Sequence, residues 1–150
     1  MTQTAKQPHG RNLRKGRFSE PGRIYVVTMV TRGRRPVFGD FSSARMVVQV
    51  MMGHEERGFA HTLCFVVMPD HIHWLMELGS IKDLAATVQS FKSMISRRLR
   101  RSVFQKGFYD HGVRREENVK AIARYIVANP LRAGLVERIE EYPHWDAVWV

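Results

Sequence analysis

Apolar residues recur along the chain with two different periods, which separate the expected strands from the expected helices. Runs rich in β-branched and aromatic residues are typical of strands. Strands are expected at 24–31, 61–68 and 71–78. Apolar residues three and four positions apart are typical of helices that bury one face. Helices are expected at 41–58, from about 84 to 99, and at 116–128, with a short irregular or strand-like piece at 103–113.

The order of these elements predicts an α+β fold. Strand, helix, strand, strand, helix and strand-like piece match a split βαβ arrangement, in which a ferredoxin-like or RRM-like antiparallel sheet carries two helices on one face. The other face is left for a ligand or for the third helix. We expect this domain at 23–136, a basic arm at 1–22 that is ordered only on a partner, and an aromatic C-terminal tail at 137–150. The tail either folds over a site or completes the core.

Charge and composition narrow the class of partner. The 150 residues include 24 Lys and Arg against 14 Asp and Glu, a net charge of +10. This balance favours a polyanion, with nucleic acid before an anionic membrane surface. The only cysteine, Cys64, excludes an internal disulfide framework and a cysteine zinc site. No apolar run reaches the roughly 18 residues of a membrane span, and the first residues lack a signal-peptide core. We therefore expect a cytoplasmic protein, nucleoid-associated if its partner is DNA.

Two histidines on the third expected strand are the sharpest local feature. Side chains at positions i and i+2 of a strand point to the same face, so His71 and His73 project together. Ile72 and Trp74 project the other way, toward the two helices. Imidazole suits Zn, Mn, Ni or Cu, and tolerates Mg²⁺ when oxygen ligands complete the shell. The pair is thus a candidate metal site, and the alternative is two half-exposed surface histidines.

The last expected helix carries a tyrosine and an asparagine on one side. At about 100° per residue, Tyr125 and Asn129 lie about 40° apart, at the edge of the apolar stripe. Such an edge lies at the rim of the core, where a nucleophilic phenol and a metal-binding amide oxygen could reach one site. Taken alone, the pair is more simply a core-edge tyrosine and an asparagine that ends the helix before Pro130.

Taken together, these motifs resemble a known family. The phrase VMPDHIHW at 67–74 resembles the HUH motif of single-tyrosine transposases, and 123–136 resembles their tyrosine helix. Segments 14–19, 107–114 and 142–149 are similar to the branch called REP-associated tyrosine transposases. The likeness runs from about residue 11 to the end, and the motifs are specific through their order and spacing.

The resemblance implies a metal-dependent transposase that cleaves and rejoins single-stranded DNA at hairpin sites formed by palindromic repeats. His71, His73 and Asn129 would bind Mg²⁺ or Mn²⁺, and Tyr125 would form a 5′-phosphotyrosine while freeing a 3′-hydroxyl. The basic arm would read a short tetranucleotide beside the hairpin, and a monomer is favoured over a dimer. Basic residues expected to contact DNA are Arg11, Arg14, Lys15, Arg17, Arg34, Arg35, Lys92, Arg97, Arg98 and Arg101.

Three further residues lie within these motifs, and two other functions are compatible with parts of the pattern. Asp70 is expected as a turn residue rather than a ligand, while Asp110 and His111 could approach the site. A non-catalytic hairpin-binding protein on an RRM-like sheet would need exposed aromatic residues on the open face. A water-using, metal-dependent nuclease would not need Tyr125 and would leave no covalent adduct.

Overall fold

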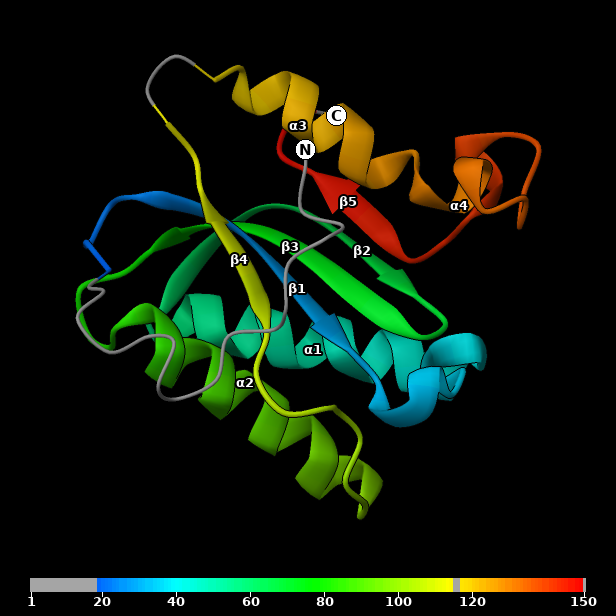
Figure 1. Ribbon diagram of the computed structural model, residues 1–150, viewed down its shortest axis with the longest axis horizontal. Coiled ribbons are helices and arrows are strands. Elements are labelled where there is room, and N and C mark those ends of the chain that lie inside the picture. The colour runs from blue at the N-terminus through cyan, green and yellow to red at the C-terminus, as the bar shows by residue number, and fades with distance from the viewer. Residues whose placement is uncertain (1–18, 115–116, 150) are drawn as a thin grey trace.

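A five-stranded antiparallel sheet forms the centre of the computed structural model, which describes residues 19–114 and 117–149 (Figure 1). Its strand order is β4-β1-β3-β2-β5, and the first four strands have the ferredoxin-like arrangement. The predicted α+β fold is confirmed. The strands are β1 (Ile24–Val30), β2 (Ala60–Met68), β3 (His71–Leu78), β4 (Tyr109–Gly112) and β5 (Trp145–Ala147). The α-helices are α1 (Phe41–Glu56), α2 (Leu84–Leu99), α3 (Val119–Val127) and α4 (Asn129–Arg132), and short 3₁₀ turns lie at Arg32–Arg34, Val37–Gly39 and Ile139–Glu141.

Helices α1 and α2 cover one face of the sheet, as expected (Figure 1). The alternation along β3 sends Ile72 and Trp74 to this face, where both are fully buried. The Trp74 and Phe91 rings lie with their centres 4.7 Å apart, which joins β3 to α2. Burial of such large apolar side chains supplies most of the free energy that holds the layers together.

Helix α3 crosses the opposite face of the sheet and closes a second core (Figure 1). Its apolar stripe, including Ile122 and Ile126, packs against Val66 of β2 and Leu75 of β3. Cys64 belongs to this core, and burial raises the pKa of its thiol to about 12. The cysteine is therefore a small buried apolar residue rather than a reactive thiol.

The segment expected as an aromatic tail is part of the fold. Its β5 pairs with β2 at the edge of the sheet. Tyr142 is buried in the second core, and its hydroxyl donates a hydrogen bond to the carbonyl of Val67 at 2.6 Å. Burial raises the pKa of Tyr142 to about 12, so this phenol stays protonated. Completion of the core, one of the two expected roles of the tail, is the one observed.

Most of the expected N-terminal arm, including Arg11, Arg14, Lys15 and Arg17, lies outside the described residues. The part that the structure describes is attached to the domain: the Ser19 hydroxyl accepts a hydrogen bond from the backbone N–H of Leu84 at 2.9 Å. Within residues 19–114 and 117–149, no helix has the length and apolar character needed to cross a membrane.

Candidate active site

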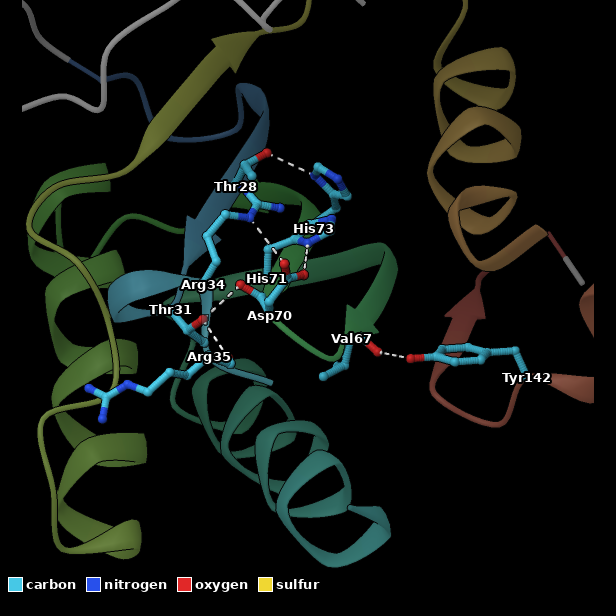
Figure 2. Close-up of polar contacts among 9 residues, drawn as sticks. All are labelled: Thr28, Thr31, Arg34, Arg35, Val67, Asp70, His71, His73 and Tyr142. Atoms are coloured by element: carbon cyan, nitrogen blue, oxygen red, sulfur yellow. Dashed lines mark hydrogen bonds and ion pairs between the residues drawn. The ribbon is translucent and has the colours of Figure 1, made fainter. Parts of the chain in front are cut away.

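The two histidines lie at the start of β3, on the face that α3 crosses, and each is held by a neighbouring oxygen (Figure 2). His71 Nδ1 lies 2.7 Å from the Asp70 carboxylate. His73 Nδ1 lies 2.8 Å from the hydroxyl of Thr28, its partner across the β1–β3 ladder. The two rings are 4.8 Å apart between centres and nearly perpendicular, at 80°. Both Nδ1 atoms are thus occupied, and the two Nε2 atoms are the ring nitrogens that remain to bind a metal ion, if the pair holds one.

Burial keeps both imidazoles neutral at neutral pH. It lowers the pKa of His73 to about 3, and the neighbouring His71 and the positive charge of Arg132 act in the same direction. Burial also lowers the pKa of His71, although its hydrogen bond to Asp70 opposes the shift. Neutral imidazole is the form that binds metal ions, so no proton has to be displaced at pH 7.

Asp70 fills the turn between β2 and β3, as expected, and it also supports the site. Besides contacting His71, its carboxylate accepts a hydrogen bond from Arg34 Nε at 3.1 Å. Burial alone would raise the pKa of Asp70, but these two partners outweigh it and the pKa is lowered. The Thr31 hydroxyl lies 2.7 Å from the carbonyl of Arg35 and 3.1 Å from that of Asp70, which ties the basic turn after β1 to the hairpin (Figure 2). Sequence reasoning missed the supporting roles of Thr28, Thr31 and Asp70.

Tyr125 lies on α3 with 48% of its surface exposed, which makes its phenol accessible to a large substrate. The guanidinium of Arg132 stacks on its ring, with Cζ 3.7 Å from the ring centre. Helix α3 crosses the face of the sheet on which the histidine pair lies, which places the helix of Tyr125 on the same side of the sheet as His71 and His73. Buried Tyr142, in contrast, is committed to a backbone carbonyl. Of these two tyrosines, only Tyr125 is available as a nucleophile.

Asn129 begins α4, one turn after Tyr125. The expectation that Asn129 and Pro130 end the helix is correct for α3, but one more turn of helix follows, because proline is tolerated in a first turn. Proline has no N–H to give to the carbonyl of Ile126, and the Asn129 side-chain nitrogen donates to that carbonyl at 3.3 Å instead. The amide oxygen of Asn129 is therefore the atom left to bind a metal.

The donor set fits a metal ion bound mainly by oxygen and imidazole. In the described part of the chain, no three His, Cys, Asp or Glu side chains lie close enough together to hold a metal. His71 and His73 would thus need oxygen ligands from elsewhere, such as Asn129, water or the substrate. Imidazole and neutral oxygen ligands suit Mn²⁺ and, with more oxygen, Mg²⁺.

A basic cleft of about 620 Å³ lies between the end of α2 and the loop that follows it. Its charged lining side chains are all basic: Lys92, Arg97, Arg100, Arg101 and Lys106. Backbone hydrogen bonds from Arg32 to Val103 and from Gln105 to Val30 connect the loop with the end of β1, where Arg34 and Arg35 are exposed. The cleft and the basic turn beside His71 are thus held by one set of backbone contacts.

The DNA-contacting residues predicted on α2 and just after it differ in their surroundings. Arg97 and Arg101 are exposed and line the cleft. Lys92 is buried, and its ammonium donates to the carbonyls of Gln105 and Gly107 at 3.0 and 2.7 Å. The Arg98 guanidinium donates to Gln49 of α1 at 3.0 Å. The sequence pattern did not separate the exposed arginines from the lysine that anchors the loop.

Asp110 and His111 lie on β4, separated from β3 by β1. His111 Nε2 contacts the Glu117 carboxylate at 2.9 Å, near the start of α3. Asp110 is buried within the fold. We therefore assign His111 to the frame around α3 rather than to the histidine pair.

Comparison with known proteins gives concordant results. The family described as "Transposase IS200 like" matches residues 22–129. A REP-associated tyrosine transposase of Haemophilus influenzae is 26% identical over an alignment of 99 residues, and the match covers 55% of this chain and 56% of the relative. Another, of Escherichia coli K12, is 24% identical over an alignment of 82 residues, and the match covers 53% of this chain and 49% of the relative. The chain thus spans about half the length of the curated relatives it matches.

Two solved structures show the same fold. A REP-associated tyrosine transposase bound to a REP hairpin superimposes with a TM-score of 0.75 at 19% identity, covering 86% of this chain and 79% of that chain. A protein described as a transposase of Deinococcus radiodurans R1 gives a TM-score of 0.54 at 19% identity, covering 69% of this chain and 87% of that one. The resemblance noted from the motifs is confirmed. Because the family match covers residues 22–129, well over half of the chain, the chain belongs to the IS200-like transposase family.

Proposed function

We propose that this protein is a metal-dependent transposase that cleaves and rejoins single-stranded DNA at hairpin sites through Tyr125. The observation that supports this most is the histidine pair on the face of the sheet crossed by the tyrosine helix, with both Nδ1 atoms occupied. Membership of the transposase family supports the same class of reaction.

His71, His73 and the Asn129 amide oxygen are the proposed ligands of Mg²⁺ or Mn²⁺. The contacts of the two Nδ1 atoms with the Thr28 hydroxyl and the Asp70 carboxylate fix the orientation of the imidazoles, and the hydrogen bond from Asn129 to Ile126 orients the amide. When bound, the metal would polarise the scissile phosphate and offset its charge.

Tyr125 is the proposed nucleophile. Its phenol loses a proton and its oxygen bonds to phosphorus, while the bond from phosphorus to the 3′ oxygen breaks. The leaving oxygen takes the bonding electron pair and a proton, which gives a 3′-hydroxyl and a 5′-phosphotyrosine. One phosphate ester is exchanged for another, so another 3′-hydroxyl can reverse the step without ATP. A free phenol has a pKa of about 10, so positive charge near Tyr125 favours the reaction.

Hairpin-bearing single-stranded DNA is the proposed partner, and the solved relative that holds a REP hairpin supports it by analogy. The basic turn at Arg34 and Arg35 and the cleft lined by Arg97 and Arg101 offer positive charge that can bind the phosphate backbone. We further propose that the arm at 1–22 reads the flanking tetranucleotide, and that the protein acts as a monomer on DNA in the cytoplasm.

The two alternatives are less well supported. An RRM-like binding module needs exposed aromatic residues on its sheet, but α3 and Tyr142 cover much of the second face. A water-using nuclease would share the histidine pair but would give no reason for an accessible phenol on the helix that crosses the same face of the sheet. No observation favours either alternative over transfer to Tyr125.

The test uses labelled hairpin oligonucleotides carrying the repeats that flank the protein's own gene, with Mg²⁺ or Mn²⁺, on a denaturing gel. We expect a slow-migrating, protease-sensitive adduct that is lost in Tyr125→Phe and kept in Tyr109→Phe, a control at a half-buried tyrosine of β4. Cleavage without an adduct in Tyr125→Phe would indicate the water-using nuclease. Tight binding without cleavage would indicate the binding module.

A further inference from the structure

Arg132 of α4 stacks on the ring of Tyr125 of α3. Both residues lie in the segment 123–136, but the sequence pattern offered no reason to expect this contact between them. The guanidinium carbon lies 3.7 Å from the centre of the phenol ring. A guanidinium stacks on aromatic rings through both its charge and its flat shape. Because Tyr125 is 48% exposed, this contact restrains a side chain that is about half open to solvent.

The turn of α4 determines where Arg132 lies. Its backbone N–H donates to the carbonyl of Ala128 at 3.0 Å, and Ala133 donates in the same way to Asn129 at 2.9 Å. Helical side chains point toward the N-terminal end of their helix, so a long side chain from α4 reaches back toward α3. The extra helical turn after Pro130 thus places the guanidinium over the phenol.

The charge of Arg132 is available to a substrate. Arginine remains protonated at any pH of interest. Across residues 19–114 and 117–149, Arg132 forms no ion pair with an acidic side chain. An unneutralised guanidinium therefore lies directly against the phenol ring.

We propose that Arg132 is a positioning residue for Tyr125: it holds the phenol ring in one orientation and keeps a positive charge over the ring. This inference rests on the proposed function, since it concerns the proposed nucleophile. An ordered phenol loses little rotational freedom when it attacks, and the nearby cation offsets the negative charge that forms when its proton leaves.

The test measures single-turnover adduct formation on the hairpin oligonucleotide with Mn²⁺, with protein in saturating excess, together with the Kd of the hairpin. We expect Arg132→Gln to react about 10²-fold more slowly at saturation, the size of a misplacement of about 1 Å. Its Kd should change no more than that of Arg124→Gln, which removes the same charge from an exposed position next to Tyr125. Arg132→Lys keeps the charge without the flat stacking surface and should react at an intermediate rate.

Two results would overturn this inference and leave the proposed function standing. In the first, Arg132→Gln reacts as fast as Arg124→Gln. In the second, Arg132→Gln binds the hairpin more weakly but reacts at the wild-type rate at saturation. If Arg132→Gln melts earlier than the wild type, Arg132→Lys decides, since a wild-type rate in that variant would refute positioning by the stack. A wild-type protein without any adduct, or an adduct that persists in Tyr125→Phe, would instead refute the proposed function and the inference with it.

Discussion

Thr28→Val tests whether the ladder neighbour of His73 orients it for metal binding. Thr28 Oγ1 lies 2.8 Å from His73 Nδ1, and the two residues are direct partners in the β1–β3 register. Valine has nearly the same shape and favours strands, so the change removes the hydroxyl with little effect on packing. It leaves His73 Nδ1 without its partner in a half-buried position.

The expected magnitude follows from the role of that bond. Removing a partner that orients a metal-binding histidine lowers metal affinity roughly 10- to 100-fold. At about 1.4 kcal/mol per tenfold, this corresponds to about 1.4 to 2.8 kcal/mol of binding free energy. The free energy of unfolding without metal should fall by only about 1 kcal/mol, the typical worth of one hydrogen bond.

The assay is isothermal titration of the protein with Mn²⁺ at pH 7, with unfolding in urea measured in parallel. Thr28→Ser keeps the hydroxyl and is the matched control, so its Mn²⁺ affinity should stay close to the wild-type value. Equal affinities in Thr28→Val and the wild type would refute the orienting role. Unchanged binding in His73→Ala would refute the metal site itself.

Three further predictions concern stability and DNA binding. Burial lowers the pKa of His54, so below about pH 6.5 the unfolded chain takes up a proton more readily than the folded chain. Tm should therefore fall between pH 7 and pH 5, and it should fall less steeply in His54→Gln. An equal slope of Tm against pH in the two proteins would contradict this prediction. Tyr142→Phe removes the buried hydrogen bond to the carbonyl of Val67. It should lower the free energy of unfolding, measured in urea, by about 1 to 3 kcal/mol. An unchanged free energy of unfolding would show that the bond does not stabilise the fold. Arg97→Gln and Arg101→Gln should each reduce the slope of log affinity against log salt by roughly 0.7 to 0.9, and an unchanged slope in both would place the DNA elsewhere.

The sequence predicted the structure well where apolar and polar residues alternate between the two faces of one strand or helix. The alternation of His71 and His73 with Ile72 and Trp74 predicted both the strand and the face of the histidines, since strand geometry is strictly two-fold. The helical spacing in α3 likewise predicted its apolar stripe. These features depend on neighbours within a few positions, which is what a single sequence displays.

The missed features depend on contacts between distant segments. Thr28 and His73 are 45 positions apart, and only the strand register brings them together. The Arg132 stack requires the chain to continue as a helix after Pro130, against the usual effect of proline. Lys92 was expected to contact DNA, but its ammonium instead donates to two carbonyls of the loop that follows α2.

Strand β5 was missed for a related reason. Its three residues are too few to show a periodic pattern, and they form a strand only because β2 offers a free edge. The aromatic content of this segment was therefore interpreted as a tail. Its aromatic Tyr142 in fact fills the second core beneath α3.

The central claim, that DNA is transferred to Tyr125, is tested most directly by mass spectrometry of the protein after reaction. The hairpin adduct would be digested with protease and nuclease, and the residue carrying the nucleotide remnant identified by fragmentation. We predict a phosphodiester-linked nucleotide on Tyr125, formed only with divalent metal present. A nucleotide on another residue, or cleaved DNA with no covalently modified peptide, would contradict the account.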